Sequence, residues 1–210
     1  MNTPATPPEK PVPLLNIANV LTMLRIALVP VFVLLLVLDA DPSRQGALTP
    51  LEAGNGAWRW AAAGVFLVAM ITDKIDGDLA RSRGLVTDFG KIADPIADKL
   101  LIGAALVMLS LLAELPWWVT VLILVRELGI TALRMAMLRT QVMPASRGGK
   151  LKTALQSAGL QLMLLPLVVI AEWLAAVGFW IMIAALVVTL VTGVDYLINA
   201  VKLRRAADGR

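Results

Sequence analysis

Histidine and cysteine are both absent from this 210-residue chain. Their absence excludes disulfides, thiol nucleophiles, the usual zinc ligand sets and any catalytic triad that uses histidine. Charged residues are scarce too, at 16% of the chain, and aromatic residues make up 5%. Any chemistry on this chain therefore depends on carboxylates, hydroxyls, lysine, arginine and added metal ions.

Hydrophobic residues, by contrast, make up 59% of the chain, and its mean hydropathy is +0.80. An ordinary soluble domain of this length is far less apolar, so the composition predicts an integral membrane protein in contact with membrane lipids. The net charge of +4 suits loops that face anionic lipid. Basic residues are not interleaved with aromatic ones, so no nucleic-acid partner is expected.

Six apolar runs cover most of the chain, and each is long enough, or nearly so, for a helix to cross a hydrocarbon core of ~30 Å. They span residues 20–38, 58–72, 92–112, 117–138, 155–174 and 177–200. Backbone polar groups in lipid must be satisfied within the protein. The runs therefore predict an all-α integral membrane protein, a bundle of six transmembrane helices.

The segments outside these runs predict the domain limits and the orientation. Residues 1–15 contain five prolines and are expected to form a flexible cytosolic arm. Residues 16–201 form the membrane domain, and residues 202–210 a basic cytosolic tail. Lysine and arginine gather after the second, fourth and sixth runs, so the positive-inside rule places both termini in the cytosol.

Four aspartates fall at helical spacing in two consecutive segments, so that each pair shares one helical face. They are Asp73, Asp76, Asp94 and Asp98. Carboxylates gathered near a membrane boundary repel one another and are costly to desolvate unless protons, bases or cations neutralise them. Oxygen ligands favour a hard cation, and two Mg²⁺ or Mn²⁺ ions would balance the four charges. Gly77 and Ala80 are small residues on the first acidic face and leave space for a ligand.

Single members of this set also have structural explanations. Asp94 precedes Pro95 and can cap a helix. Asp73 can pair with Lys74, and Gly77 can serve helix packing. Capping and pairing do not explain why acids recur at three- and four-residue spacings in two consecutive segments, so metal binding accounts better for the whole set.

These residues also match a known pattern. The sequence resembles the CDP-alcohol phosphotransferase family, whose signature reads DxxDGxxAR, then eight residues, then GxxxDxxxD. Every fixed position is filled, by Asp73, Asp76, Gly77, Ala80, Arg81, Gly90, Asp94 and Asp98. The resemblance covers about residues 16–200. It implies a homodimeric enzyme of a bacterial inner (plasma) membrane whose active site faces the cytosol.

The resemblance assigns roles to the matched residues. It implies that Asp73 and Asp94 bridge two divalent metals, while Asp76 completes a metal shell. It further implies that Asp98 binds metal and accepts the proton of the attacking alcohol, in direct in-line attack without a covalent intermediate. The residues expected to contact the CDP-lipid are Asp76, Gly77, Ala80, Arg81, Thr87, Asn19 and Thr22.

Residues 16–25, 126–134 and 149–153 resemble the phosphatidylglycerophosphate synthase branch of the family. On this resemblance the substrates are CDP-diacylglycerol and glycerol 3-phosphate. The acceptor phosphate is expected on Arg126, Arg134, Lys150 and Lys152.

Alternatives remain open for this acceptor site. Arg126 lies inside an apolar run, which makes it a functional candidate, although Glu127 can simply pair with it. Lys150 and Lys152 can equally be ordinary cytosolic loop charges. Within the family, a phosphatidylinositol phosphate synthase or a cardiolipin synthase is the alternative. Outside it, a divalent-cation transporter also places acids within a membrane, but transport does not require the glycines and Arg81 at those gaps.

Overall fold

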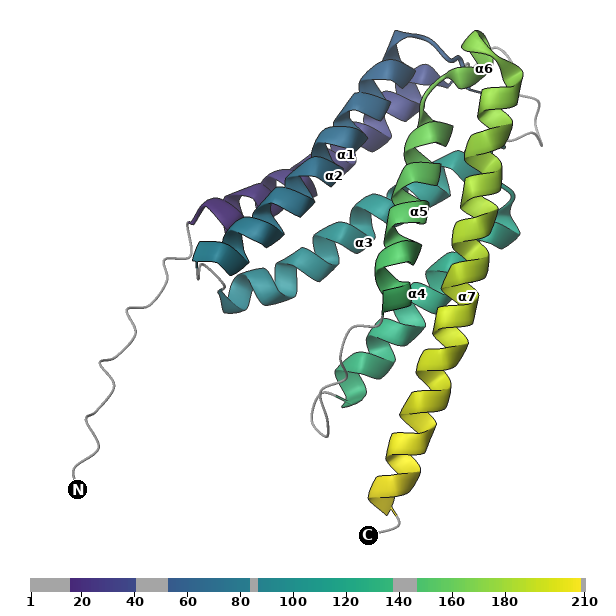
Figure 1. The fold of residues 1–210 in the computed structure, drawn as a ribbon. Helices are drawn as coiled ribbons and strands as arrows, with labels where there is room; N and C mark the ends of the chain where they lie inside the picture. Colours follow the sequence, from purple (N-terminus) through teal and green to yellow (C-terminus); the bar gives the residue numbers. More distant parts are fainter. Residues whose placement is uncertain (1–15, 41–52, 84–86, 138–146, 209–210) are drawn as a thin grey trace.

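The computed structural model describes residues 16–40, 53–83, 87–137 and 147–208 (Figure 1). Within these ranges the chain is helical, with no strand beyond an isolated bridge between Ala40 and Ala53. The predicted all-α architecture is therefore confirmed for the described residues. Two segments, Asn19–Asp39 and Glu172–Asn199, are long and apolar enough to cross a membrane. The count of six spans and the orientation remain predictions.

Six long helices and one short helix follow one another along the chain. They are α1 (Ile17–Asp39), α2 (Ala57–Arg83), α3 (Asp88–Leu111), α4 (Trp117–Met137), α5 (Arg147–Leu164), α6 (Leu167–Ile170) and α7 (Glu172–Asp208). α1 and α2 run in opposite directions, as do α2 and α3 (Figure 1). As a result, the start of α1, the end of α2 and the start of α3 lie together at one end of the molecule.

Two predicted boundaries differ from the structure. The fifth apolar run was expected to continue as one helix over residues 155–174, and this is wrong. α5 ends at Leu164, and α7 begins only at Glu172. Pro166 lies between α5 and α6, and its missing N–H prevents the helix from continuing. At the C-terminus, α7 extends to Asp208 and includes most of the predicted tail. The predicted arm, residues 1–15, lies outside the described residues.

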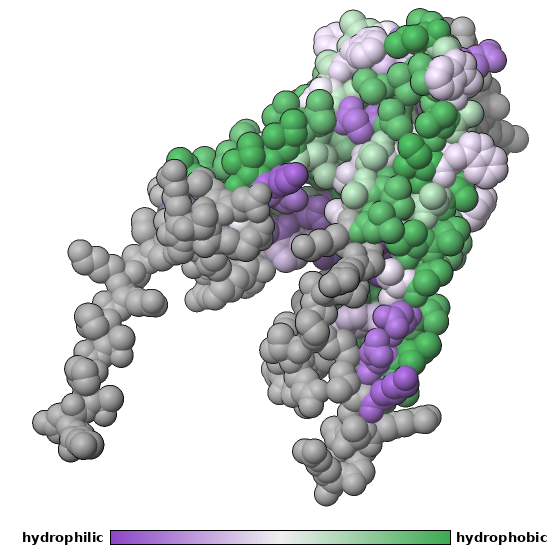
Figure 2. Space-filling view, viewed as in Figure 1, coloured by the Kyte–Doolittle hydropathy of each residue, from purple (hydrophilic) through white to green (hydrophobic). Residues whose placement is uncertain are grey.

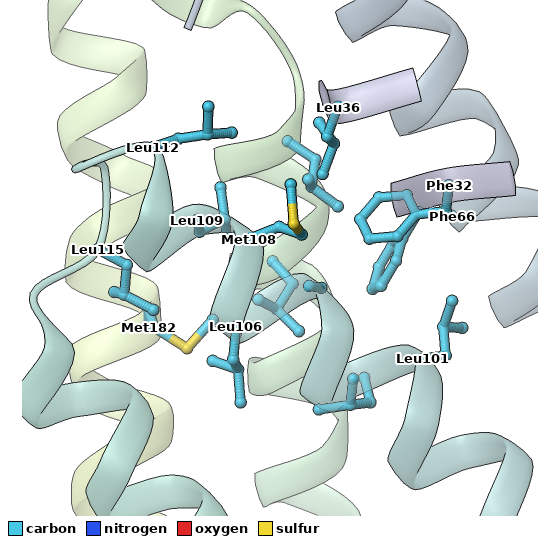
Figure 3. Close-up of a cluster of buried hydrophobic side chains, with 14 of the residues drawn as sticks. Phe32, Leu36, Phe66, Leu101, Leu106, Met108, Leu109, Leu112, Leu115 and Met182 are labelled. Atoms are coloured by element: carbon cyan, nitrogen blue, oxygen red, sulfur yellow. The ribbon is translucent and has the colours of Figure 1, made fainter. Parts of the chain in front are cut away.

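The core lies where the six long helices, α1 to α5 and α7, meet (Figure 3). Phe32 of α1 and Phe66 of α2 are fully buried, and their ring centroids lie 5.7 Å apart at a tilt of 44°. Leu101, Leu106 and Leu109 present the buried face of α3 to the same cluster. Packing of this kind, rather than transfer out of water, holds helices together in lipid.

A buried charge lies at the end of the molecule opposite the acidic segments. Arg59 of α2 is fully buried and donates to the carbonyl oxygens of Leu164 and Met163, each at 2.9 Å. These carbonyls end α5 just before Pro166, where the helix lacks its own donors. Arg59 also pairs with Glu114 in the turn between α3 and α4. Burial raises the pKa of the Glu114 carboxyl, and the charge of Arg59 opposes that rise.

All six tryptophans are at least 48% exposed, and they lie at or near the starts of three helices. They are Trp58 and Trp60 on α2, Trp117 and Trp118 on α4, and Trp173 and Trp180 on α7. Tryptophan gathers where a membrane meets water. The outer surface shown in Figure 2 is otherwise largely hydrophobic over α1, α2 and α7. Both features support the predicted membrane protein.

The contact between α5 and α7 gives a test of the fold. A Cβ added at Gly159 of α5 would lie 3.1 Å from the backbone nitrogen of Met182 in α7. Gly159→Leu should therefore lower the melting temperature in detergent, because overpacking costs ~1–3 kcal/mol. Gly64→Leu on α2 is the matched control, since a Cβ there meets nothing within 4 Å. Equal losses in both variants, measured by scanning fluorimetry, would argue against this packing.

Candidate functional site

A buried ion pair fixes the first of the predicted metal ligands. Arg25 of α1 is fully buried, and its Nη1 lies 2.6 Å from Oδ1 of Asp73 in the second half of α2. A guanidinium removed from water needs a nearby carboxylate, because an unpaired buried charge is strongly destabilising. The sequence prediction left Arg25 out of the site, although a charge within an apolar run was a signal for it.

A hydroxyl one turn earlier on α1 holds a second predicted ligand. Thr22 is 1% exposed, and its Oγ1 donates to Oδ1 of Asp94 in α3 at 2.5 Å. Hydrogen bonds to a carboxylate are short and strong, and they fix the orientation of a carboxylate that ligates a metal. Thr22 was expected to contact the CDP-lipid. The structure places it against a predicted metal ligand, and its contact with the CDP-lipid stays a prediction.

Two other residues expected to contact the CDP-lipid join α1 to the start of α3. The hydroxyl of Thr87 donates to Oδ1 of Asn19 at 3.0 Å and accepts the N–H of Gly90 at the same distance. Thr87 is thus the N-cap of α3. A Cβ at Gly90 would lie 3.0 Å from Oδ1 of Asn19, so a glycine allows α1 and α3 to approach this closely.

Asp98 lines a cavity between α3, α4 and α5. Polar residues in its wall are Asp98, Lys99, Glu127, Lys152, Thr153, Gln156 and Ser157. The amino group of Lys152 donates to Oε1 of Glu127. The predicted base and one predicted cation of the acceptor site therefore share a cavity. Figure 2 shows hydrophilic side chains in the hollow between α1 and α2 on one side and α5 and α7 on the other.

Arg126 lies beside this cavity rather than in its wall. Its Nη1 donates to Oε1 of Glu127 at 3.2 Å, and its Nη2 donates to the hydroxyl of Thr192 in α7 at 2.9 Å. The Arg126 side chain lines an apolar groove between α4 and α7 that also contains Gly193. The pairing with Glu127, which the sequence left open as a structural alternative, is thus present.

The remaining predicted residues divide into two groups. Gly77 lies on α2 and is partly buried. The side chains of Asp76, Ala80, Arg81, Arg134 and Lys150 lie outside the part that the structure describes. Among the described side chains, no group of three acids is placed to hold a metal ion. The four-aspartate site, which requires Asp76, therefore stays a prediction.

The described donors nevertheless suit a hard divalent cation. Asp73, Asp94 and Asp98 supply carboxylate oxygens, the ligand type that Mg²⁺ and Mn²⁺ prefer. Arg25 and Thr22 orient the first two of these groups from α1. Such supporting contacts are typical of metal sites and tune their affinity.

Comparisons with known proteins agree with the signature. The sequence model of the CDP-alcohol phosphatidyltransferase family matches residues 15–191. The chain is similar to the probable phosphatidylglycerophosphate synthase of Mycobacterium tuberculosis (strain CDC 1551 / Oshkosh), with 48% identity over 89% of this chain and 82% of that protein. It is 36% identical to the CDP-diacylglycerol–glycerol-3-phosphate 3-phosphatidyltransferase of Bacillus subtilis (strain 168), over 86% and 93% of the two chains. The protein of the same name from Rickettsia typhi (strain ATCC VR-144 / Wilmington) is also 36% identical, over 86% and 94%.

Thr22 gives a test of the metal site. Thr22→Val keeps the shape of the side chain and removes the hydroxyl that donates to Asp94. Mn²⁺ binding, followed by electron paramagnetic resonance, should weaken by roughly 10- to 100-fold because the carboxylate loses its orienting contact. Thr131→Val is the matched control, since that hydroxyl donates to the Glu127 carbonyl of its own helix. Unchanged Mn²⁺ affinity in Thr22→Val would count against this arrangement.

Proposed function

The chain belongs to the CDP-alcohol phosphatidyltransferase family, and we propose that it transfers the phosphatidyl group of CDP-diacylglycerol to glycerol 3-phosphate. The products are phosphatidylglycerophosphate and CMP. The names of the three relatives support this acceptor. The observation that carries the proposal is the shared cavity, where a carboxylate suited to act as base, Asp98, lies with the buried cation of Lys152.

The reaction requires a proton acceptor beside the attacking hydroxyl. The hydroxyl oxygen of glycerol 3-phosphate forms a bond to the phosphorus that carries the diacylglycerol. The bond from that phosphorus to the oxygen of CMP breaks, and the hydroxyl proton passes to Asp98. Asp98 holds this proton until it is released to solvent, and CMP leaves with the bonding electrons. Hydroxyl attack in a single step needs no nucleophilic side chain, in agreement with a chain that has neither cysteine nor histidine.

Two divalent cations, Mg²⁺ or Mn²⁺ held by Asp73, Asp76, Asp94 and Asp98, would offset the charge of the pyrophosphate and of the leaving CMP. Arg25 and Thr22 keep two of these carboxylates in place. Lys152 supplies positive charge for the acceptor phosphate, while Glu127 holds its amino group at the cavity wall. Arg126, Arg134 and Lys150 complete the proposed basic site.

The same proposal sets the protein in the membrane. Six helices cross the bilayer of a bacterial inner membrane, with both termini and the active site at the cytosolic side, and two copies form a homodimer. Lysine and arginine gather near the C-terminal ends of α2, α4 and α7, which supports this orientation. The exposed tryptophans lie near the starts of α2, α4 and α7, where the opposite interface would be.

The choice of acceptor tests the function directly. Purified protein with CDP-diacylglycerol and Mg²⁺ or Mn²⁺ should release CMP when glycerol 3-phosphate is added. Inositol 1-phosphate and phosphatidylglycerol, offered separately, should give little release. A preference for either of these would assign the protein to another branch of the family. No metal-dependent release with any alcohol would favour a transporter.

Asp98→Asn tests the proposed base. The amide keeps the shape of the side chain but cannot accept the proton, so turnover should fall by roughly 100-fold or more while CDP-diacylglycerol still binds. CMP release gives the turnover, and equilibrium binding of labelled CDP-diacylglycerol gives the affinity. Asp195→Asn on the exposed side of α7 is the control and should keep wild-type turnover. Near-normal activity of Asp98→Asn would remove Asp98 from the mechanism.

A further inference from the structure

Two polar side chains of α5 that line the cavity at Asp98, Gln156 and Ser157, have no hydrogen-bond partner among the described residues. Gln156 of α5 is 3% exposed and lines this cavity. Within the described part of the chain, no hydrogen bond reaches its amide. The amide atoms of Gln156 are not among the fully buried side-chain atoms that lack a partner, so they face the cavity and can bind a group that enters it.

Two other residues of the cavity wall, Lys152 and Thr153, have hydrogen-bond partners. Lys152 donates to Glu127 across the cavity, and the hydroxyl of Thr153 donates to the Gly149 carbonyl of its own helix at 3.1 Å. Gln161 lies farther along α5 and away from this cavity; its Nε2 donates to the carbonyl of Ala63 in α2 at 3.3 Å, while its Oε1 is buried without a partner. The amide of Gln156 therefore remains available for a molecule that enters the cavity.

The position of Gln156 indicates which part of that molecule it meets. Gln156 follows Lys152 by four residues, so the two side chains lie on one face of α5 about 5–6 Å apart at Cβ. An acceptor that directs its attacking hydroxyl to Asp98 and its phosphate to Lys152 has one polar group left, its second hydroxyl. The cavity, of about 50 Å³, has room for a few groups the size of water and suits a short polyol rather than an acyl chain.

We infer that Gln156 is a specificity-determining residue whose amide binds the second, non-attacking hydroxyl of the acceptor. This inference rests on the proposed function. An amide offers both a donor and an acceptor, and a hydroxyl can satisfy both. An acceptor that lacks this hydroxyl cannot make these hydrogen bonds, so the enzyme discriminates against it.

Two acceptors that differ by one hydroxyl test the inference. Glycerol 3-phosphate and propane-1,3-diol monophosphate have the same phosphate and the same attacking hydroxyl, but the second compound lacks the central hydroxyl. The kcat/KM for each is measured by CMP release with wild type, Gln156→Met and Gln161→Met. Methionine keeps the length of the side chain and removes both amide groups. Gln161→Met is the matched control on the same helix.

Wild type should favour glycerol 3-phosphate by roughly tenfold or more in kcat/KM. Gln156→Met should bring the ratio of the two kcat/KM values close to one, and Gln161→Met should keep the wild-type ratio. Equal use of both acceptors by the wild type would overturn the inference. This measurement needs no variant, so it decides the question even if Gln156→Met fails to fold. An equal loss for both acceptors in Gln156→Met would overturn it as well. No release by the wild type with glycerol 3-phosphate would refute the proposed function itself.

Discussion

The arrangement of the candidate site depends on a charge buried inside α1. Arg25 is removed from water and lies against Asp73, so α1 cannot separate from the end of α2 without exposing an unpaired guanidinium to an apolar environment. Thr22 lies three residues earlier on the same face of α1 and bonds Asp94 of α3. One helix thereby joins both acidic segments, through Asp73 of α2 and Asp94 of α3.

The sequence identified the acids by their spacing, and their role as metal ligands stays a prediction. Asp73 lies on α2, and Asp94 and Asp98 lie on α3. Their supporting groups were harder to predict. Thr22 and Asn19 were expected to contact the CDP-lipid, and the sequence did not indicate that they also bond Asp94 and Thr87, about 70 residues away along the chain. Contacts between distant helices have no periodicity in the sequence, so local patterns cannot identify them.

Other features also depend on helix packing and could not be predicted from the sequence. Arg59 begins an apolar run between two tryptophans, which the sequence shows, but its bonds to the end of α5 depend on the break at Pro166. The prediction missed that break because it followed hydropathy across the proline. Gln156 carries no motif at all. Its interest comes from a buried amide beside Asp98 that lacks a partner in the described structure, and only the packing of α3, α4 and α5 produces that condition.

Gly90 and Asp98 belong to the same signature but meet different requirements, one of helix packing and one of the proposed chemistry. The neighbours of Gly90 leave no room for a side chain, because a Cβ there would lie 3.0 Å from Asn19 and 3.3 Å from Thr87. Asp98 lies eight residues later on the same helix, where its side chain lines the cavity. A saturation-mutagenesis screen that separates protein abundance from turnover would therefore divide the signature. Substitutions at Gly90 would reduce the amount of folded protein, whereas substitutions at Asp98 would yield folded protein that does not turn over.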